Sequence, residues 1–328
     1  MIEEKNIVKK IEKIFCVLLD NDSKYLRWNS KKPFIDFEFN IAYSLFSEIG
    51  KEFDIKVIFA KYSDYSNGFI KKYWFFEKKW EKSNNKVKPN LFYDKFPMTK
   101  EGISLKKKLS KKNILFNSFE LELFCKDKYL QSKKFPEFSP KTFLIKNNKD
   151  FLKSFKKIES EKIILKPRYG LGSKGIKIFD KKEKIRKQNF SEDYILQEFI
   201  DTSKGIPELN INGVHDLRCV VVNGKICFSF VRIPKKGLIA SIHRGGKAIN
   251  VRVPKKVFLM VKKIDFFMKF FGNRFYSVDV FFSNNKYYLV ELNSKPGFGV
   301  GVEFGFTKKE EELMKIVFKE IVSKHFYY

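Results

Sequence analysis

Two apolar runs that flank a short polar turn constrain the fold of this chain more than any other part of its sequence. Residues 275–282 and 287–293 are rich in Phe, Tyr, Val and Leu, and the residues between them are Ser, Asn, Asn and Lys. This pattern predicts an antiparallel β-hairpin. Asp279, Glu291 and Asn293 interrupt the apolar runs. The fold must therefore accommodate acidic groups in an apolar setting.

The register of this hairpin decides whether its acidic groups meet. A turn with an odd number of residues would place Asp279 opposite Glu291, and a two-residue turn would offset them by one. Glu291 and Asn293 are two residues apart and share a face. Two carboxylates among apolar side chains repel each other and are costly to bury, and a bound Mg²⁺ or Mn²⁺ removes that cost. We predict that Asp279, Glu291 and Asn293 are metal ligands; the alternative is that both carboxylates face solvent.

A glycine-rich loop, residues 166–175, fits the pattern GxGxxG with Gly170, Gly172, Ser173 and Gly175. In dinucleotide-binding folds such a loop runs from a strand into a helix. Here residues 176–179 alternate like a strand, so a hairpin flap is predicted. Its backbone N–H groups would fold over phosphates, and Lys166 would place an ammonium on the α- or β-phosphate. An ordinary glycine hairpin with surface lysines fits this segment equally well.

The order of elements predicts a mixed α/β protein with two domains. Residues 1–120 alternate between strands and helices, which favours a small α/β domain with a parallel sheet. One of its predicted strands covers residues 73–80. Residues 121–328 read as a second, larger domain. We divide it into a nucleotide-flap subdomain, residues 121–197, and a metal-binding subdomain, residues 198–328.

The formal net charge of +29 has three possible explanations. It fits a nucleic-acid binder or an acidic substrate. However, the excess is spread along the chain, and Lys, Asn, Ile and Phe are abundant together, as AT-rich codons would give. We therefore favour a solvated lysine surface that reflects composition, and nucleic acid is not the expected partner.

Several absences point to the cytoplasm. The N-terminus has no cationic patch followed by an apolar run, so no secretory signal is predicted. The apolar segment 257–271 contains charged residues and is too short to cross a membrane. No two of the four cysteines form a CxxC pair, which favours reduced thiols over a zinc site.

With these motifs in their order, the sequence resembles the ATP-grasp superfamily, most closely the RimK-like branch of carboxylate–amine ligases. The resemblance extends from about Lys128 to Phe306. It rests on the glycine flap after Lys-Pro and on short motifs further along the chain: Gln197-Glu198-Phe199-Ile200, Asp216-Leu217-Arg218, Arg232, His243-Arg244-Gly245-Gly246, Val278-Asp279 and Glu291-Leu292-Asn293-Ser294-Lys295-Pro296-Gly297.

The resemblance implies a role for each matching position. The fold would be an ATP-grasp fold, with ATP held between antiparallel sheets and preceded by a small α/β domain. The strand Gln197, Glu198, Phe199 and Ile200 would contact adenine. By the same resemblance, Lys128 and Lys166 would bind phosphate and Asp216 would contact the nucleotide. The residues around the transferred phosphate would be Arg218, Arg232 and Arg244. The metal ligands would be Asp279, Glu291 and Asn293.

Two departures from the family pattern concern the acceptor more than ATP. The segment 201–214 is longer than the connection usual in this branch. Ser241 replaces an Asn that in the branch helps to hold nucleotide or substrate. These differences put the acceptor specificity in doubt.

The resulting prediction is an ATP- and Mg²⁺-dependent ligase that joins a carboxylate to an amine through an acyl phosphate, with an amino acid such as glutamate as one possible amine. Three alternatives stay open: a phosphotransferase that stops after phosphorylation, a basic nucleic-acid-binding protein, and an inactive grasp fold that only binds.

Overall fold

The structure is a computed structural model of the chain, and it describes residues 12–21, 26–97, 99–170, 174–182, 188–238 and 245–325. It divides into two compact units. The first comprises residues 1–116 together with 317–328, and the second comprises residues 117–316. The domain division drawn from the sequence, with its boundary near residue 120, stays a prediction about which parts fold independently.

The first unit is built on a five-stranded sheet with the order β6-β5-β2-β1-β7. β1 (Ile14–Leu19) pairs in parallel with both β2 (Lys56–Lys61) and β7 (Leu91–Asp94). Every residue of β1 is buried, as expected for a central parallel strand that is covered on both faces. The parallel sheet predicted from the sequence is therefore confirmed for these three strands.

The prediction is wrong at the edge of this sheet. Residues 73–80 form not one strand but β5 (Tyr73–Phe76) and the start of β6 (Trp80–Ser83), which pair antiparallel. The charged sequence Glu-Lys-Lys separates the aromatic run of β5 from Trp80 and turns the chain. Other elements described in this unit are α1 (Phe37–Glu52), β3 (Tyr65–Ser66), β4 (Phe69–Ile70), α2 (Lys100–Ser110), a π-helical segment (Phe318–Val322) and the 3-10 helices Tyr62–Asp64 and Ser323–His325.

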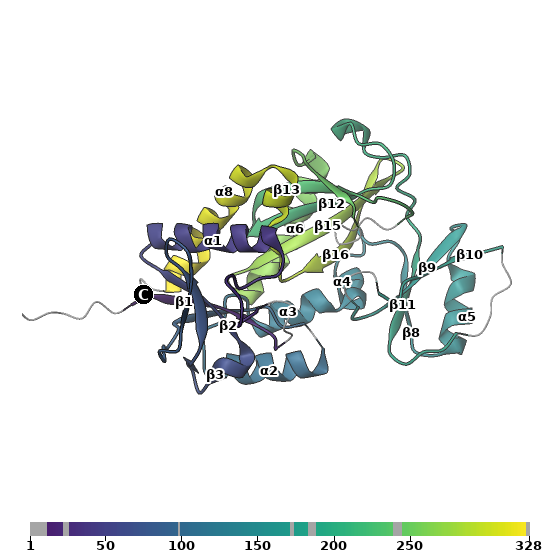
Figure 1. Cartoon of the computed structure of the whole chain (residues 1–328). Coiled ribbons are helices and arrows are strands. Elements are labelled where there is room, and N and C mark those ends of the chain that lie inside the picture. Colours follow the sequence, from purple (N-terminus) through teal and green to yellow (C-terminus); the bar gives the residue numbers. More distant parts are fainter. Residues whose placement is uncertain are drawn as a thin grey trace, which may run out of the picture. The chain divides into compact units, whose positions relative to one another are not determined.

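The second unit contains two antiparallel sheets, which Figure 1 shows in teal and in green to yellow. The smaller has the order β10-β9-β11-β8. Its strands are β8 (Thr142–Ile145), β9 (Lys162–Pro167), β10 (Lys177–Asp180) and β11 (Tyr194–Glu198). α5 (Asn148–Lys157) covers one face, because its buried Phe151 and Phe155 pack against Ile163, Leu165 and Leu196. The glycine loop connects β9 to β10, which pair antiparallel, so the predicted hairpin is confirmed.

The larger sheet has the order β14-β13-β12-β15-β16. Its strands are β12 (Asp216–Val222), β13 (Lys225–Ile233), β14 (Lys247–Asn250), β15 (Phe275–Ser283) and β16 (Lys286–Asn293). One face is apolar and packs against α6 (Lys255–Met268), whose Val257, Val261 and Ile264 are fully buried. The opposite face is free to carry polar side chains, as antiparallel sheets allow.

The described part of the second unit also contains the α-helices α3 (Phe119–Lys126), α4 (Lys128–Lys134), α7 (Val300–Phe304) and α8 (Thr307–Val317), besides two short 3-10 helices, Pro207–Leu209 and Lys269–Phe271. The long segment 201–214 folds compactly, since Ile206 and Ile211 bridge each other and are buried in the core beneath the larger sheet. Within the described residues, no helix is both long and apolar enough to cross a membrane.

Candidate active site

A cleft of about 260 Å³ lies between the two sheets of the second unit. Its lining includes most of the residues singled out from the sequence: Lys128, Lys166, Gly170, Gln197, Glu198, Phe199, Ile200, Asp216, Arg218, Arg232, Glu291 and Asn293. Asp279 and Gly175 do not line it. Gly172, Ser173, Ser241, His243 and Arg244 lie outside the described residues.

The β15–β16 hairpin brings Asp279 opposite Glu291 by a route that the sequence did not predict. The turn has two residues, Asn284 and Asn285, with φ angles of 47° and 58°. Two asparagines at positive φ form a type I′ turn, which alone would offset the carboxylates by one residue. A β-bulge between Asp279 and Val280 removes the offset, since Val280 pairs with Leu289 and Asp279 with Glu291.

Asp279 is held by two arginines. Arg218 stands opposite it on β12 and donates from Nε and Nη2 to its two carboxylate oxygens, at 2.6 and 2.5 Å. Arg232 adds a hydrogen bond of 2.8 Å from Nη2. Asp279 is only 1% exposed. Burial alone would raise the pKa of this carboxyl, but the two guanidinium groups hold its pKa below the usual range, so it is ionised.

Asp216 completes this charged row. It lies opposite Arg232 in the β12–β13 ladder, and the two side chains form an ion pair. Burial, with a smaller contribution from the nearby Asp279, nevertheless raises the pKa of Asp216 to about 7. Its Oδ1 and the Nε of Arg232 are buried without a hydrogen-bond partner among the described residues. Buried polar atoms of this kind usually have a partner, which points to a ligand that would supply one.

Glu291 and Asn293 both line the cleft from β16, so they share one face of the strand. The Nδ2 of Asn293 lies 3.3 Å from an oxygen of Asp279 and 3.3 Å from an oxygen of Glu291. Both distances are long for hydrogen bonds. A partly positive amide group thus stands where the two carboxylates converge, and rotation of the amide would present its oxygen instead. Two carboxylates and an amide oxygen are a donor set that fits Mg²⁺.

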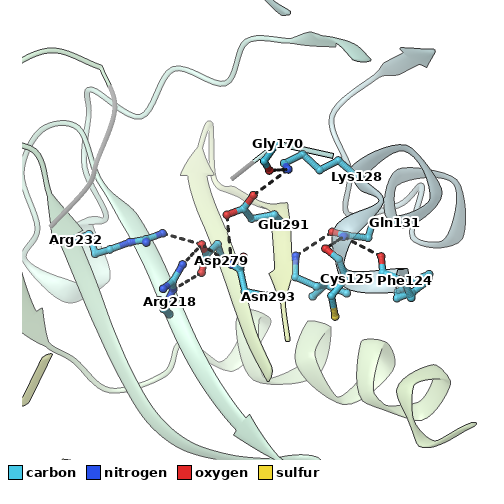
Figure 2. A network of polar contacts seen from close by, with 11 residues as sticks. Phe124, Cys125, Lys128, Gln131, Gly170, Arg218, Arg232, Asp279, Glu291 and Asn293 are labelled. Atoms are coloured by element: carbon cyan, nitrogen blue, oxygen red, sulfur yellow. Dashed lines mark hydrogen bonds and ion pairs between the residues drawn. The ribbon is translucent and has the colours of Figure 1, made fainter. Parts of the chain in front are cut away.

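The two lysines of the cleft differ in their surroundings. Lys128 begins α4, and its ammonium hydrogen-bonds the carbonyl oxygen of Gly170 and lies 3.7 Å from Glu291 (Figure 2). The ammonium of Lys166 has neither a hydrogen bond nor an ion pair among the described residues. Burial, with a contribution from Lys128, lowers the pKa of Lys166 to about 8. A buried lysine in this state favours an anionic ligand, because such a ligand would stabilise its charged form.

The strand at the rim of the cleft has an open backbone position. The side chain of Gln197 donates to Thr142 Oγ1 at 2.7 Å and is therefore committed to the sheet. The N–H groups of Glu198 and Phe199 donate to the carbonyls of Lys141 and Lys162. The N–H of Ile200 has no acceptor among the described residues. This segment can thus bind a ligand through its backbone.

Glycine is required at the end of the flap. Gly175 has a φ of 73°, and a Cβ at this position would lie 2.9 Å from Pro167 Cγ. A side chain would be strained by the backbone angle and would collide with the strand that enters the loop.

Sequence analysis missed two residues that organise the site. Arg168 binds Asp127 through Nε and Nη2, at 2.9 and 2.5 Å, and Asp193 through Nη1 at 3.0 Å. Asp127 also caps α4 by accepting from the N–H of Leu130. Gln131 joins α3 and α4 to β16. An arginine in a chain that mostly uses lysine was a signal for Arg168, but no local signal marks Gln131.

His215 has a structural role. It is fully buried, its Nε2 accepts from the backbone N–H of Phe282, and its Nδ1 lies 3.1 Å from the carbonyl of Gly213. Both ring nitrogens are therefore used, and burial lowers the pKa of the imidazole. His215 therefore packs beneath the sheet and is not placed to act as a base.

The cleft between two antiparallel sheets, with a glycine hairpin on one and an acidic hairpin on the other, defines an ATP-grasp protein. Residues 126–309, more than half of the chain, match the RimK-like ATP-grasp domain. The chain therefore belongs to the RimK-like ATP-grasp family, and the resemblance drawn from its motifs is confirmed.

Similar proteins agree with this assignment. The chain is 35% identical over 106 residues to a protein of Halorhodospira halophila named probable alpha-L-glutamate ligase. The aligned residues make up 32% of this chain and 31% of the relative. The chain thus spans about a third of the length of the curated relatives it matches.

Solved structures extend the likeness to nearly the whole fold. The D-cycloserine synthetase DcsG is 11% identical, with 93% of this chain and 99% of that chain covered and a TM-score of 0.61. A RiPP-associated ATP-grasp ligase of Chryseobacterium gregarium, solved with ADP and a leader and core peptide, is 10% identical, with coverages of 94% and 97% and a TM-score of 0.58. These matches confirm the predicted fold class.

Proposed function

We propose that this chain is an ATP-dependent carboxylate–amine ligase that works with Mg²⁺ or Mn²⁺. The observation that carries the proposal is the charge arrangement of the cleft. Five cationic side chains line it, together with the carboxylates of Glu198, Asp216 and Glu291: Lys128, Lys166, Lys174, Arg218 and Arg232. Such a site suits a polyanionic ligand that arrives with a divalent cation, which describes a nucleoside triphosphate.

ATP would be held from its base to its phosphates along the smaller sheet. The free N–H of Ile200 would bind adenine, with Gln197, Glu198 and Phe199 forming the surrounding strand. Lys166 and Lys128 would bind the phosphates, and the flap with Gly170, Gly172, Ser173 and Gly175 would cover them. Asp216, with its unpartnered Oδ1, would accept a hydrogen bond from the nucleotide.

Asp279, Glu291 and Asn293 would hold the metal ion. When bound, it neutralises phosphate oxygens and orients the terminal phosphate. Asp279 is already paired with two arginines. It would therefore fix the position of the metal site as well as bind the metal ion.

The arginines are arranged to bind the transferred phosphoryl group. Arg218 and Arg232 both line the cleft and use Nη2 to hold Asp279. Their Nη1 groups form no hydrogen bond with the described residues and remain available. A substrate carboxylate oxygen would attack the γ-phosphorus, forming a P–O bond as ADP leaves, while the arginines neutralise the developing charge. An amine would then attack the acyl carbon and lose a proton, and inorganic phosphate would leave.

The substrates are proposed from the relatives. The curated relatives are named probable alpha-L-glutamate ligases, and one solved neighbour binds a peptide. Glutamate or a similar amino acid as the amine, and a small molecule or peptide as the carboxylate, fit the basic cleft. Arg244 remains a proposed contact to the reacting groups.

The first test is release of ADP and phosphate from Mg²⁺-ATP with carboxylates and amino acids supplied singly and in pairs. A ligase requires both substrates and yields a product with a new amide mass. Turnover with one substrate and a phosphorylated product would instead establish a kinase. Absence of both turnover and Mg²⁺-dependent nucleotide binding would contradict the proposal.

A further inference from the structure

Gln131 is a buried amide in the third position after Lys128 on α4, and it is 2% exposed. Its Nε2 donates to the carbonyl of Cys125 at 2.7 Å and to that of Phe124 at 3.3 Å, both at the end of α3. Its Oε1 accepts from the backbone N–H of Leu292 at 2.9 Å. Three hydrogen bonds thus connect this side chain of α4 to one other helix, α3, and to the strand β16.

Leu292 lies between Glu291 and Asn293, so Gln131 holds the backbone of the proposed metal ligands. β16 is the last strand of its sheet, and N–H groups on the outer edge of such a strand have no neighbouring strand to bind. Gln131 supplies the missing acceptor at this point. In Figure 2 it stands between the strand that carries Glu291 and Asn293 and the carbonyl groups of α3.

Gln131 also fixes the distance between the metal ligands and a phosphate-binding lysine. Residues three apart share one face of a helix, so Lys128 and Gln131 point toward the same strand. Lys128 reaches Glu291 at 3.7 Å while Gln131 holds the adjacent Leu292. A shift of β16 relative to α4 would therefore move Glu291 away from Lys128.

Two neighbouring contacts brace the same stretch of chain. Asn117 donates to the carbonyl of Ser294 at 2.5 Å, and Lys295 pairs at 2.8 Å with the buried Glu122 of α3. These contacts hold the chain after Asn293, whereas Gln131 binds the outward-facing backbone N–H between the two proposed ligands.

We infer that Gln131 is a positioning residue, which sets the geometry of Glu291 and Asn293 for a divalent cation and nucleotide through the N–H of Leu292. The inference rests on the proposed function. The amide of Gln131 cannot be replaced by an isosteric side chain, because this position needs donors for two carbonyl groups and an acceptor for one N–H. Groups that orient metal ligands in this way typically change metal affinity or activity by about 10–100-fold when mutated.

The test compares Gln131→Met with Tyr276→Phe in the full chain. Tyr276→Phe also removes a buried hydrogen bond of the second unit, from the hydroxyl to Asp265, but touches no proposed ligand. Binding of ADP is measured by calorimetry at increasing Mg²⁺, alongside thermal unfolding. We expect Gln131→Met to raise the half-saturating Mg²⁺ concentration about tenfold or more. Tyr276→Phe should lower the unfolding temperature without changing the Mg²⁺ dependence.

A Gln131→Met protein with the Mg²⁺ dependence of the wild type would overturn the inference, whatever its unfolding temperature. If that variant does not fold, Gln131→Asn replaces it, since the shorter amide cannot span all three partners. Unchanged Mg²⁺ dependence in Gln131→Asn would overturn the inference equally. A wild-type chain that binds ADP without need of Mg²⁺ would overturn both the inference and the proposed metal site. Mg²⁺-dependent binding that is unaltered in the variants removes only the role of Gln131.

Discussion

The two walls of the cleft differ in whether their charged and polar groups have partners within the protein. The lysine wall, formed by β9, β10 and β11, presents a buried ammonium on Lys166 and a backbone N–H on Ile200, neither with a partner among the described residues. The carboxylate wall, formed by β12, β13, β15 and β16, presents Asp279 already bound by two arginines. The lysine wall therefore requires a ligand to satisfy its polar groups, whereas most of the carboxylate wall is satisfied without one.

This difference predicts that mutations on the two walls will separate stability from function. On the carboxylate wall a charge is part of the packed fold, and its removal leaves other charges buried. On the lysine wall a charge is a cost to the folded state, which a phosphate group would offset. The predictions below test this contrast in order of expected effect.

Asp279→Ala should have the largest effect, since it damages both fold and function. Arg218 would lose its carboxylate partner and Arg232 would keep only Asp216. Leaving one member of a buried ion pair alone costs about 3–5 kcal/mol. We expect the denaturant midpoint of the second unit to fall clearly and turnover to disappear. Denaturation followed by circular dichroism measures the first effect. Wild-type stability in this variant would show that the arginine network does not stabilise the fold.

Glu291→Gln should abolish function while leaving the fold intact. Glu291 is 25% exposed and its contact with Lys128 is 3.7 Å long, so the free energy of unfolding should change by less than about 1 kcal/mol. Loss of a ligand that anchors the metal removes several kcal/mol of charge stabilisation from the transition state. Because each 1.4 kcal/mol changes the rate tenfold, turnover should fall by about 1,000-fold. Steady-state turnover and thermal unfolding are measured together, with the exposed Glu161→Gln as control. Near-normal turnover would remove Glu291 from the metal site.

Lys166→Met should weaken nucleotide binding by about 10–100-fold, as expected when one charge-assisted contact to phosphate is lost. In the folded chain the pKa of Lys166 is lowered to about 8, from 10.5 in the unfolded chain. Between these two pH values the unfolded chain holds a proton that the folded chain lacks, so Lys166 makes stability rise with pH. This rise should vanish in Lys166→Met and persist in Lys162→Met, an exposed lysine of the same strand.

The same lysine gives a proton-linked signal on binding. Phosphate would stabilise the charged form of Lys166, so ADP binding near pH 8.5 should take up as much as about one proton. Calorimetry in buffers of different ionisation enthalpy measures this uptake. Equal uptake by wild type and Lys166→Met would mean that Lys166 does not meet the phosphates.

Features that depend on local sequence were predictable. The hairpins of the flap and of β15–β16 follow from alternation around polar turns. The register of β15–β16 was not predicted, because the bulge adds a residue to one strand. A signal for it exists: Leu289 and Leu292 are buried and three residues apart, which breaks the two-residue period of a strand.

Features that depend on distant residues were not predictable without the family resemblance. The pairing of Arg218 with Asp279 joins residues 61 apart in the chain, and that of Gln131 with Leu292 joins residues 161 apart. The prediction of a single strand at the edge of the first unit was wrong for a different reason. Its aromatic residues favour a strand on both sides of a short charged turn, and composition alone does not separate one long strand from two short ones.

Arg168→Lys should have the smallest effect and sharpens the comparison, because it tests an arginine beside the lysine wall that does not line the cleft. Arg168 binds Asp127 with two nitrogen atoms, a geometry that lysine cannot reproduce. Its side chain is 20% exposed, so the loss of stability should stay within about 1 kcal/mol. Because Asp127 caps the helix that begins with Lys128, the affinity for ADP should fall only a few-fold, with kcat nearly unchanged. A loss as large as that of Lys166→Met would mean that Arg168 contacts the nucleotide, and the lysine wall would then use an arginine in the same manner as the carboxylate wall.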